Sequence, residues 1–96
     1  MRFILTSILS LALAFDAGSV LTQDYQKGLV AYGLEDYDAA MREWRPLAEQ
    51  GHADSQEWIG FLYFYGEGVP QNYAEAAKWY RLAAEQGWRR LRVFSV

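Results

Sequence analysis

The chain has 96 residues, of which 52% are hydrophobic and 17% aromatic, so it can form one small domain with a buried core. Its formal net charge of −3 at pH 7 disfavours nucleic acid as a partner. It contains no cysteine, which excludes disulfide bridges, thiolate metal ligands and lipidation through an N-terminal cysteine.

The first segment has the features of a secretory signal peptide. Met1 and Arg2 precede the apolar and small run FILTSILSLALAF. This run is about a dozen residues long, shorter than the roughly 20 that cross a membrane, so an uncleaved anchor is the weaker alternative. We therefore expect a signal peptide within residues 1–19, cleaved after Ala14 or Ser19. The mature protein would be periplasmic or secreted, with no stable membrane span after cleavage.

The rest of the chain repeats itself. The segment YDAAMREWRPLAEQG at residues 37–51 returns thirty-six residues later as YAEAAKWYRLAAEQG at residues 73–87. A fixed period of this length is typical of helical-hairpin arrays, in which each unit buries its apolar face against a neighbour. Helical spacing within each copy predicts one apolar stripe along one side of a helix. The stripes are Tyr37, Ala40, Met41, Trp44, Leu47 and Ala48 in the first copy, and Tyr73, Ala76, Ala77, Tyr80, Ala83 and Ala84 in the second.

A further helix is expected ahead of each copy, over residues 22–32 and 54–65, which gives four helices in two hairpins. Asp36 can cap the second helix. Asn72 and Glu75 predict a capping box before the fourth helix, with Asn72 accepting from an early N–H group and Glu75 reaching back.

Two features predict where the repeated helices end or bend. Gly51 and Gly87 stand where a left-handed C-cap residue is expected. Pro46 falls inside the first copy, where it removes a backbone hydrogen bond, so we expect a kink there.

The second hairpin carries a closely spaced set of motif residues. They are Ile59, Gly60, Leu62, Tyr63, Gly66, Gly68, Val69, Tyr73, Ala76, Trp79 and the closing run Ala83, Ala84, Glu85, Gln86 and Gly87. This set resembles the Sel-1-like repeat, a relative of the tetratricopeptide repeat. Residues 25–51 resemble a shorter, degenerate first repeat without the Gly-x-Gly-Val loop. The resemblance implies an all-α, right-handed solenoid of two antiparallel helix pairs that binds proteins rather than catalysing a reaction.

The resulting boundaries are a degenerate first repeat at residues 20–51, a Sel-1-like repeat at 52–87 and a C-terminal tail at 88–96. The tail, WRRLRVFSV, departs from the repeat pattern. Three interpretations stay open: a short basic capping helix, a flexible tail, or the point at which a longer array was cut off. The capping helix would use Trp88, Leu91 and Phe94 on one side.

The candidate protein-binding surface lies on the helix expected over residues 54–65. Glu57, Gly60, Phe61 and Phe64 recur there at spacings of three and four. If exposed, the two phenylalanines form the kind of apolar patch that marks a protein or peptide site. The alternative is that they are solenoid core or a truncated repeat interface.

Catalytic and metal chemistry have little support in the sequence. His52 stands next to Asp54 in the inter-repeat turn with no second histidine, and a solvated turn residue is the simpler interpretation. Asp36 and Asp38 crowd a helix start, where capping and the helix dipole already favour acids. We expect no catalytic residue, cofactor or metal.

The sequence therefore predicts a non-enzymatic scaffold or adaptor that is exported to the cell envelope and binds a protein or peptide. Self-association is a further option for its partner. The alternatives are a truncated remnant of a longer Sel-1-like repeat protein without independent activity and, third, an envelope enzyme or enzyme accessory.

Overall fold

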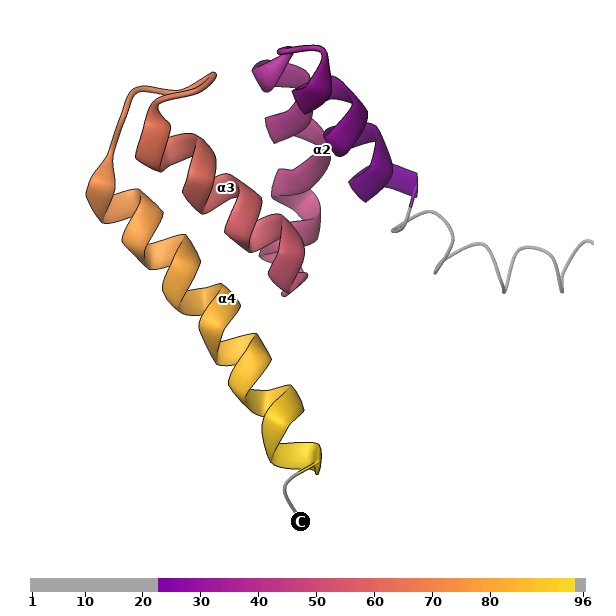
Figure 1. The fold of residues 1–96 in the computed structure, drawn as a ribbon, viewed down its shortest axis with the longest axis vertical. Helices are drawn as coiled ribbons and strands as arrows, with labels where there is room; N and C mark the ends of the chain where they lie inside the picture. The colour runs from indigo at the N-terminus through magenta and orange to yellow at the C-terminus, as the bar shows by residue number, and fades with distance from the viewer. Residues whose placement is uncertain (1–22, 95–96) are drawn as a thin grey trace, which may run out of the picture.

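The computed structural model describes residues 23–94, and for residues 88–94 it describes the backbone alone. Over this range the chain forms a helix at residues 23–33, then α2 (Tyr37–Glu49), α3 (Ala53–Tyr65) and α4 (Tyr73–Phe94) (Figure 1). The four helices form two consecutive hairpins, which confirms the predicted all-α fold. The expected signal peptide and its cleavage sites lie outside the described residues.

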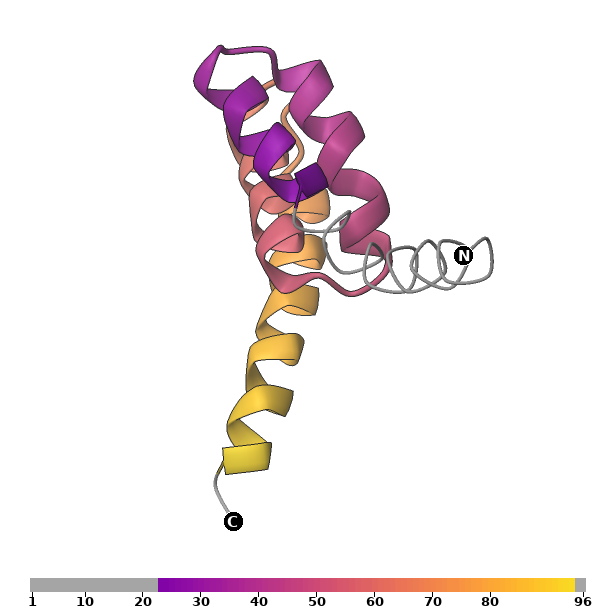
Figure 2. The ribbon, with the colours of Figure 1, turned by 90° about the vertical axis from the view of Figure 1, so that its right-hand side faces the viewer.

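The helices follow one another back and forth. Helix 23–33 and α2 form the first hairpin, and α3 packs against α2 on one side and against α4 on the other (Figures 1 and 2). The last turns of α4 continue beyond the end of α3 and extend away from the body of the molecule. The core therefore lies around α3, where the two hairpins meet.

The core is dominated by a large aromatic side chain from the first hairpin. Trp44 is fully buried with Ile59 and Leu62 of α3, and its indole N–H donates to the Tyr25 carbonyl at 3.1 Å. Trp58 of α3 stacks on Trp44 with ring centroids 5.0 Å apart and an interplanar angle of 20°. Stacking of this kind adds to the free energy gained from burial, so α3 is held firmly on the first hairpin.

Polar caps define both repeated helices. The Asp36 carboxylate accepts from the Ala39 N–H at 3.2 Å, as predicted. The Asn72 side chain accepts from the Glu75 N–H at 3.1 Å, which confirms the forward half of the capping box. The reciprocal half is wrong, because the Asn72 N–H donates instead to the Tyr63 carbonyl at 2.9 Å. That bond ties the start of α4 to α3.

The Gly-x-Gly-Val loop joins the two hairpins as well as the two helices of its own repeat. Gly66 ends α3 in the left-handed conformation, with φ of 66°. Gly68 has φ of 74°, and a Cβ there would lie 2.6 Å from the Tyr37 Cβ at the start of α2. Glycine is therefore required at position 68 both by its backbone conformation and by close packing.

The predicted helix ends are only partly correct. Gly51 has the expected positive φ, of 95°, after α2. Gly87 does not cap α4, because the helix passes through it to Phe94. The following residues WRRLRVF contain good helix formers and no proline, and they outweigh the cost of about 1 kcal/mol that one helical glycine carries. Pro46 lies inside the continuous helix α2, and the kink expected there stays a prediction.

The apolar stripe predicted for the second copy is wrong as a single stripe. Ala76, Trp79 and Ala83 are buried, whereas the predicted members Tyr73, Ala77, Tyr80 and Ala84 are exposed. Trp79 offers more apolar surface than Tyr80, so the helix turns Trp79 inward. In the first copy, Ala40, Trp44, Leu47 and Ala48 are buried as expected.

Candidate protein-binding groove

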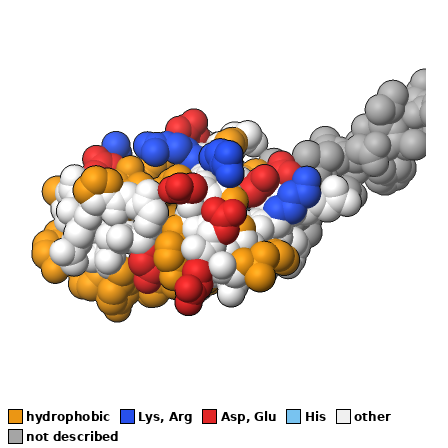
Figure 3. Space-filling model, turned by 90° about the horizontal axis from the view of Figure 1, so that it is seen from above, with side chains coloured by type: hydrophobic (Ala, Val, Ile, Leu, Met, Phe, Trp, Pro, Cys, Tyr) orange, Lys and Arg blue, Asp and Glu red, His pale blue; other side chains and the backbone are white. Residues whose placement is uncertain are grey.

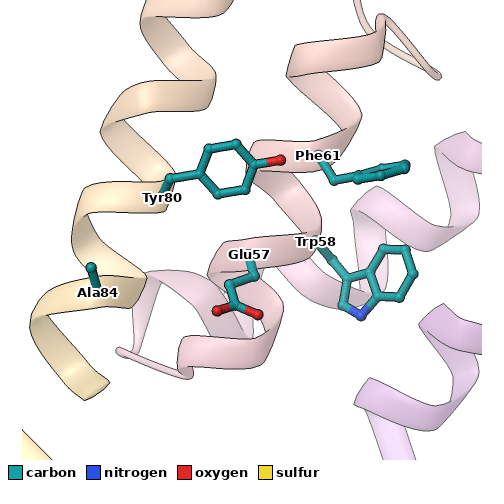
Figure 4. A pocket seen from close by; sticks show the side chains of 5 residues that line it. All are labelled: Glu57, Trp58, Phe61, Tyr80 and Ala84. Atoms are coloured by element: carbon teal, nitrogen blue, oxygen red, sulfur yellow. The ribbon is translucent and has the colours of Figure 1, made fainter. Parts of the chain in front are cut away.

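A hollow of about 410 Å³ lies over α3, and residues of α3 and α4 line it (Figure 4). Glu57, Trp58 and Phe61 line it from α3, and Tyr80 and Ala84 line it from α4. We call these five residues the groove. Apolar side chains form most of its wall, and Glu57 supplies a carboxylate.

The α3 wall of the groove is fixed by aromatic contacts with the first hairpin. The Trp58 indole N–H donates to the Tyr25 hydroxyl at 3.1 Å, and its ring lies 5.7 Å from that of Phe61 in an edge-to-face arrangement. Phe61 also contacts Tyr32, with ring centroids 6.1 Å apart. Because these contacts restrict both side chains, this wall has a fixed arrangement.

The α4 wall is formed by Tyr80, whose ring lies over a glycine of α3. A Cβ at Gly60 would lie 2.9 Å from the Tyr80 ring, so the missing side chain allows this close approach. Tyr80 stays 37% exposed. Burial raises the pKa of its phenol above the ordinary 10.0, and Tyr65 and the Glu57 carboxylate raise it further. The phenol is therefore neutral at physiological pH.

The structure brings together part of the predicted site. Glu57 and Phe61 both line the groove, and Gly60 lies buried beneath Tyr80. Phe64 lies outside the groove, where its ring contacts Tyr65 and Tyr73 and remains 40% exposed. The predicted surface therefore divides into a groove and a separate aromatic contact beside the start of α4.

Sequence reasoning missed Trp58, Tyr80 and Ala84. The spacing of residues does not single out Trp58, and it predicts Tyr80 and Ala84 in the apolar stripe of the fourth helix. The signal that could have identified Tyr80 is its place in the repeat, because it corresponds to Trp44 in the first copy.

The two hairpins also share a local geometry in which a glycine of one helix lies under an aromatic ring of the next. In the first hairpin, a Cβ at Gly28 would overlap the Trp44 indole, just as a Cβ at Gly60 would press on Tyr80. The first pair is covered by Trp58 of α3. The equivalent pair in the second hairpin faces the groove.

The candidate acid, base and metal residues have structural roles. His52 is the N-cap of α3: its Nδ1 accepts from the Ser55 N–H at 3.2 Å and lies 2.6 Å from the Ser55 hydroxyl. It also packs edge-to-face against Tyr25, so it is more than a solvated turn residue. Asp36 is engaged as a helix cap. Among the described residues, no three potential metal ligands come together.

Charges of both signs are mixed with hydrophobic side chains over the face shown in Figure 3. The ion pair among the described side chains, residues 23–87, joins Arg45 and Glu49 at 3.5 Å, and both are exposed.

No helix in the described part of the chain is long and apolar enough to cross a membrane.

Consecutive helical hairpins packed through a shared core define a helical repeat protein. Residues 53–88 match the family model of the Sel1 repeat. The second hairpin is therefore a Sel1 repeat, as the sequence motifs indicated. Sel1 repeats are in general non-catalytic modules that mediate protein interactions.

The chain is also similar to the exopolysaccharide production negative regulator of Rhizobium meliloti (strain 1021), with 37% identity over 82 residues. The match covers 79% of this chain and 31% of the relative, so the chain spans about a third of the relative's length. No solved structure matches the chain.

Proposed function

We propose that this protein is a non-enzymatic scaffold that binds a helical segment of a protein in the groove lined by α3 and α4. The observation that carries the proposal is the groove itself, a hollow with aromatic walls, an accessible tyrosine ring and one carboxylate. Aromatic residues in concave surfaces are typical binding anchors for proteins.

The shape of the groove favours a helix as the ligand. In the first hairpin, the corresponding surface around Trp44 is already covered by a helix, α3. The second hairpin repeats the pairing of an α-helical glycine with an aromatic ring, in Gly60 and Tyr80. A helix laid in this groove would meet the same kind of surface that α3 meets.

We further propose that the protein acts in the periplasm or outside the cell, because its first residues have the features of a signal peptide. The similarity to a negative regulator supports a regulatory rather than metabolic setting for the scaffold. Cell fractionation tests the location, and finding the chain with an intact N-terminus in the cytoplasm would contradict it.

Photo-crosslinking inside cells tests the binding function. A benzophenone amino acid replaces Ala84 in the groove, and a control variant carries it at Leu34, which is 76% exposed in the turn of the first hairpin. We expect a discrete protein adduct from position 84 and none of that mass from position 34. Absence of any adduct at position 84, with the variant folded by circular dichroism, would contradict the proposal.

A further inference from the structure

One exposed face of α4 carries a regular series of residues. Tyr73, Ala77, Tyr80 and Ala84 are all exposed and follow one another at spacings of four, three and four. Gly87 continues this spacing and, in the sequence, so do Leu91 and Phe94. Alternating steps of three and four form the heptad pattern that brings one helix against another.

Half of this series lies beside the body of the molecule and half beyond it. Tyr80 and Ala84 form the α4 wall of the groove. The backbone of residues 88–94 extends the same helix past the end of α3, where Figures 1 and 2 show no other described helix beside it. The first part of α4 therefore lines a groove, and its last turns project from the body of the molecule.

The internal repeat indicates the direction of a helix that would fill the groove. The chain reverses between α2 and α3, and α3 covers Trp44 and Ala48 of the first hairpin. Tyr80 and Ala84 are the corresponding residues of α4. By this correspondence, the helix that covers them runs antiparallel to α4.

The projecting segment also complements the groove in charge. Residues 88–94 contain Arg89, Arg90 and Arg92, whereas the groove contains Glu57. Among the described side chains, residues 23–87, no ion pair involves Glu57. An arginine can pair with a carboxylate and stack on an aromatic ring at the same time, and Tyr80 lies in the same groove.

We propose that two copies of this chain pair through antiparallel α4 helices, each placing residues 88–94 in the groove of the other. The inference rests on the proposed function, for which it names the partner. Such a pairing is two-fold symmetric and closes on itself, so it produces a dimer rather than a filament.

The dimensions of α4 suit this arrangement. The segment from Tyr80 to Phe94 is about 21 Å long, enough for two heptads of contact. Gly87 lies at its midpoint, and a Cβ there would meet nothing within 4 Å in the single copy. The second helix can therefore approach closely at the crossing point, while the last turns of each α4 reach Tyr80 and Ala84 of the other.

Sedimentation of the purified protein over a concentration series tests the proposal, and the wild-type chain is expected to be a dimer. Glu57→Arg and the triple change Arg89→Glu, Arg90→Glu and Arg92→Glu should each weaken dimerisation by about tenfold or more, because like charges then meet. Mixing these two variants should restore a one-to-one dimer, since both contacts in the mixed pair regain opposite charges. Glu49→Arg, an exposed change in the first hairpin with the same change in charge, should leave the dimer intact.

A wild-type chain that stays monomeric over the series would overturn the proposal, and so would a dimer that the two groove-directed changes leave unaffected. Failure of the mixed variants to pair would overturn the antiparallel arrangement. The adduct from position 84 separates this inference from the proposed function. If the chain is monomeric and position 84 forms an adduct with a different protein, the proposed function holds and the proposed dimer is wrong.

Discussion

Gly28 and Gly60 occupy corresponding positions in the two hairpins, but their surroundings differ. The ring above Gly28 belongs to Trp44, which is fully buried, whereas the ring above Gly60 belongs to Tyr80, which is 37% exposed. A buried ring cannot move away from an added methyl group, while an exposed ring can. The same substitution should therefore have different effects in the two repeats.

We expect Gly28→Ala to lower the free energy of unfolding by about 2–3 kcal/mol, because its methyl group would overlap the Trp44 indole. Gly60→Ala should cost less than about 1 kcal/mol, since the Tyr80 ring can swing outward and alanine favours the helix. Urea unfolding followed by circular dichroism measures both values. Equal costs would show that Tyr80 is packed as rigidly as Trp44.

His52 shows how a residue outside the usual capping set can escape sequence analysis. Ser, Thr, Asp and Asn are the expected N-caps, and none of them precedes α3. The imidazole Nδ1 nevertheless accepts from the Ser55 N–H and so replaces the missing oxygen acceptor. Its location in a turn could be predicted, but its bond with the helix end could not.

At the scale of the helices, Gly87 has two interpretations, a C-cap of α4 or a residue inside it, and one substitution distinguishes them. If Gly87 were a left-handed C-cap, alanine there would be strained. In the continuous helix, Gly87→Ala should instead raise the free energy of unfolding by about 0.5–1 kcal/mol.

The Gly87→Ala measurement is best made in the Glu57→Arg background, so that any dimer does not contribute to stability. Gly51→Ala serves as the comparison. Gly51 has a positive φ of 95°, so alanine there should lower the free energy of unfolding of the protein. A loss of stability at both positions would show that α4 ends at Gly87 in solution.

Most helix boundaries could be predicted because caps and turns are local, and the end of α4 is the exception. The sequence places the third helix at residues 54–65, and the structure has it at Ala53–Tyr65. The orientation of α4 could not be predicted in the same way. Two apolar series overlap on this helix, and the choice between them depends on how well Trp79 fits against α3, which is a tertiary effect.

The candidate site likewise has residues that spacing on one helix can place and residues that depend on the packing of two helices. Glu57 and Phe61 lie on one helix, so their spacing was enough to place them on one surface. Tyr80 and Ala84 join them from a different helix, and their position depends on the rotation of α4. Phe64 shares the spacing of Phe61, but its ring packs beside Tyr73, outside the groove.

At the scale of the whole molecule, one carboxylate connects the two hairpins. Glu67 lies in the loop between α3 and α4, close enough to Tyr32 and Tyr37 of the first hairpin to raise the pKa of both phenols. Gly68 packs against Tyr37 beside it. The loop that defines the Sel1 repeat therefore also fastens the second hairpin to the first.

This connection predicts a loss of stability at alkaline pH. The pKa of Tyr32 is raised above 10.0 by burial, then by the neighbouring Glu67 carboxylate. The pKa of Tyr37 is raised by partial burial, Glu67 and Glu35. A tyrosine whose pKa is higher in the folded state holds its proton more tightly there. Its contribution to stability is therefore complete below about pH 10 and is lost as the pH rises through the folded-state pKa.

The free energy of unfolding, measured in urea from pH 7 to about pH 11, should be nearly constant at first and then fall above about pH 10. Glu67→Gln should reduce that alkaline fall, because an amide no longer raises the pKa of either tyrosine by its charge. Glu49→Gln removes an exposed carboxylate from α2 and should leave the fall unchanged. If Glu67→Gln and Glu49→Gln behaved alike, the two hairpins would not be coupled through Glu67, and the loop would have to act through the packing of Gly68 on Tyr37 alone.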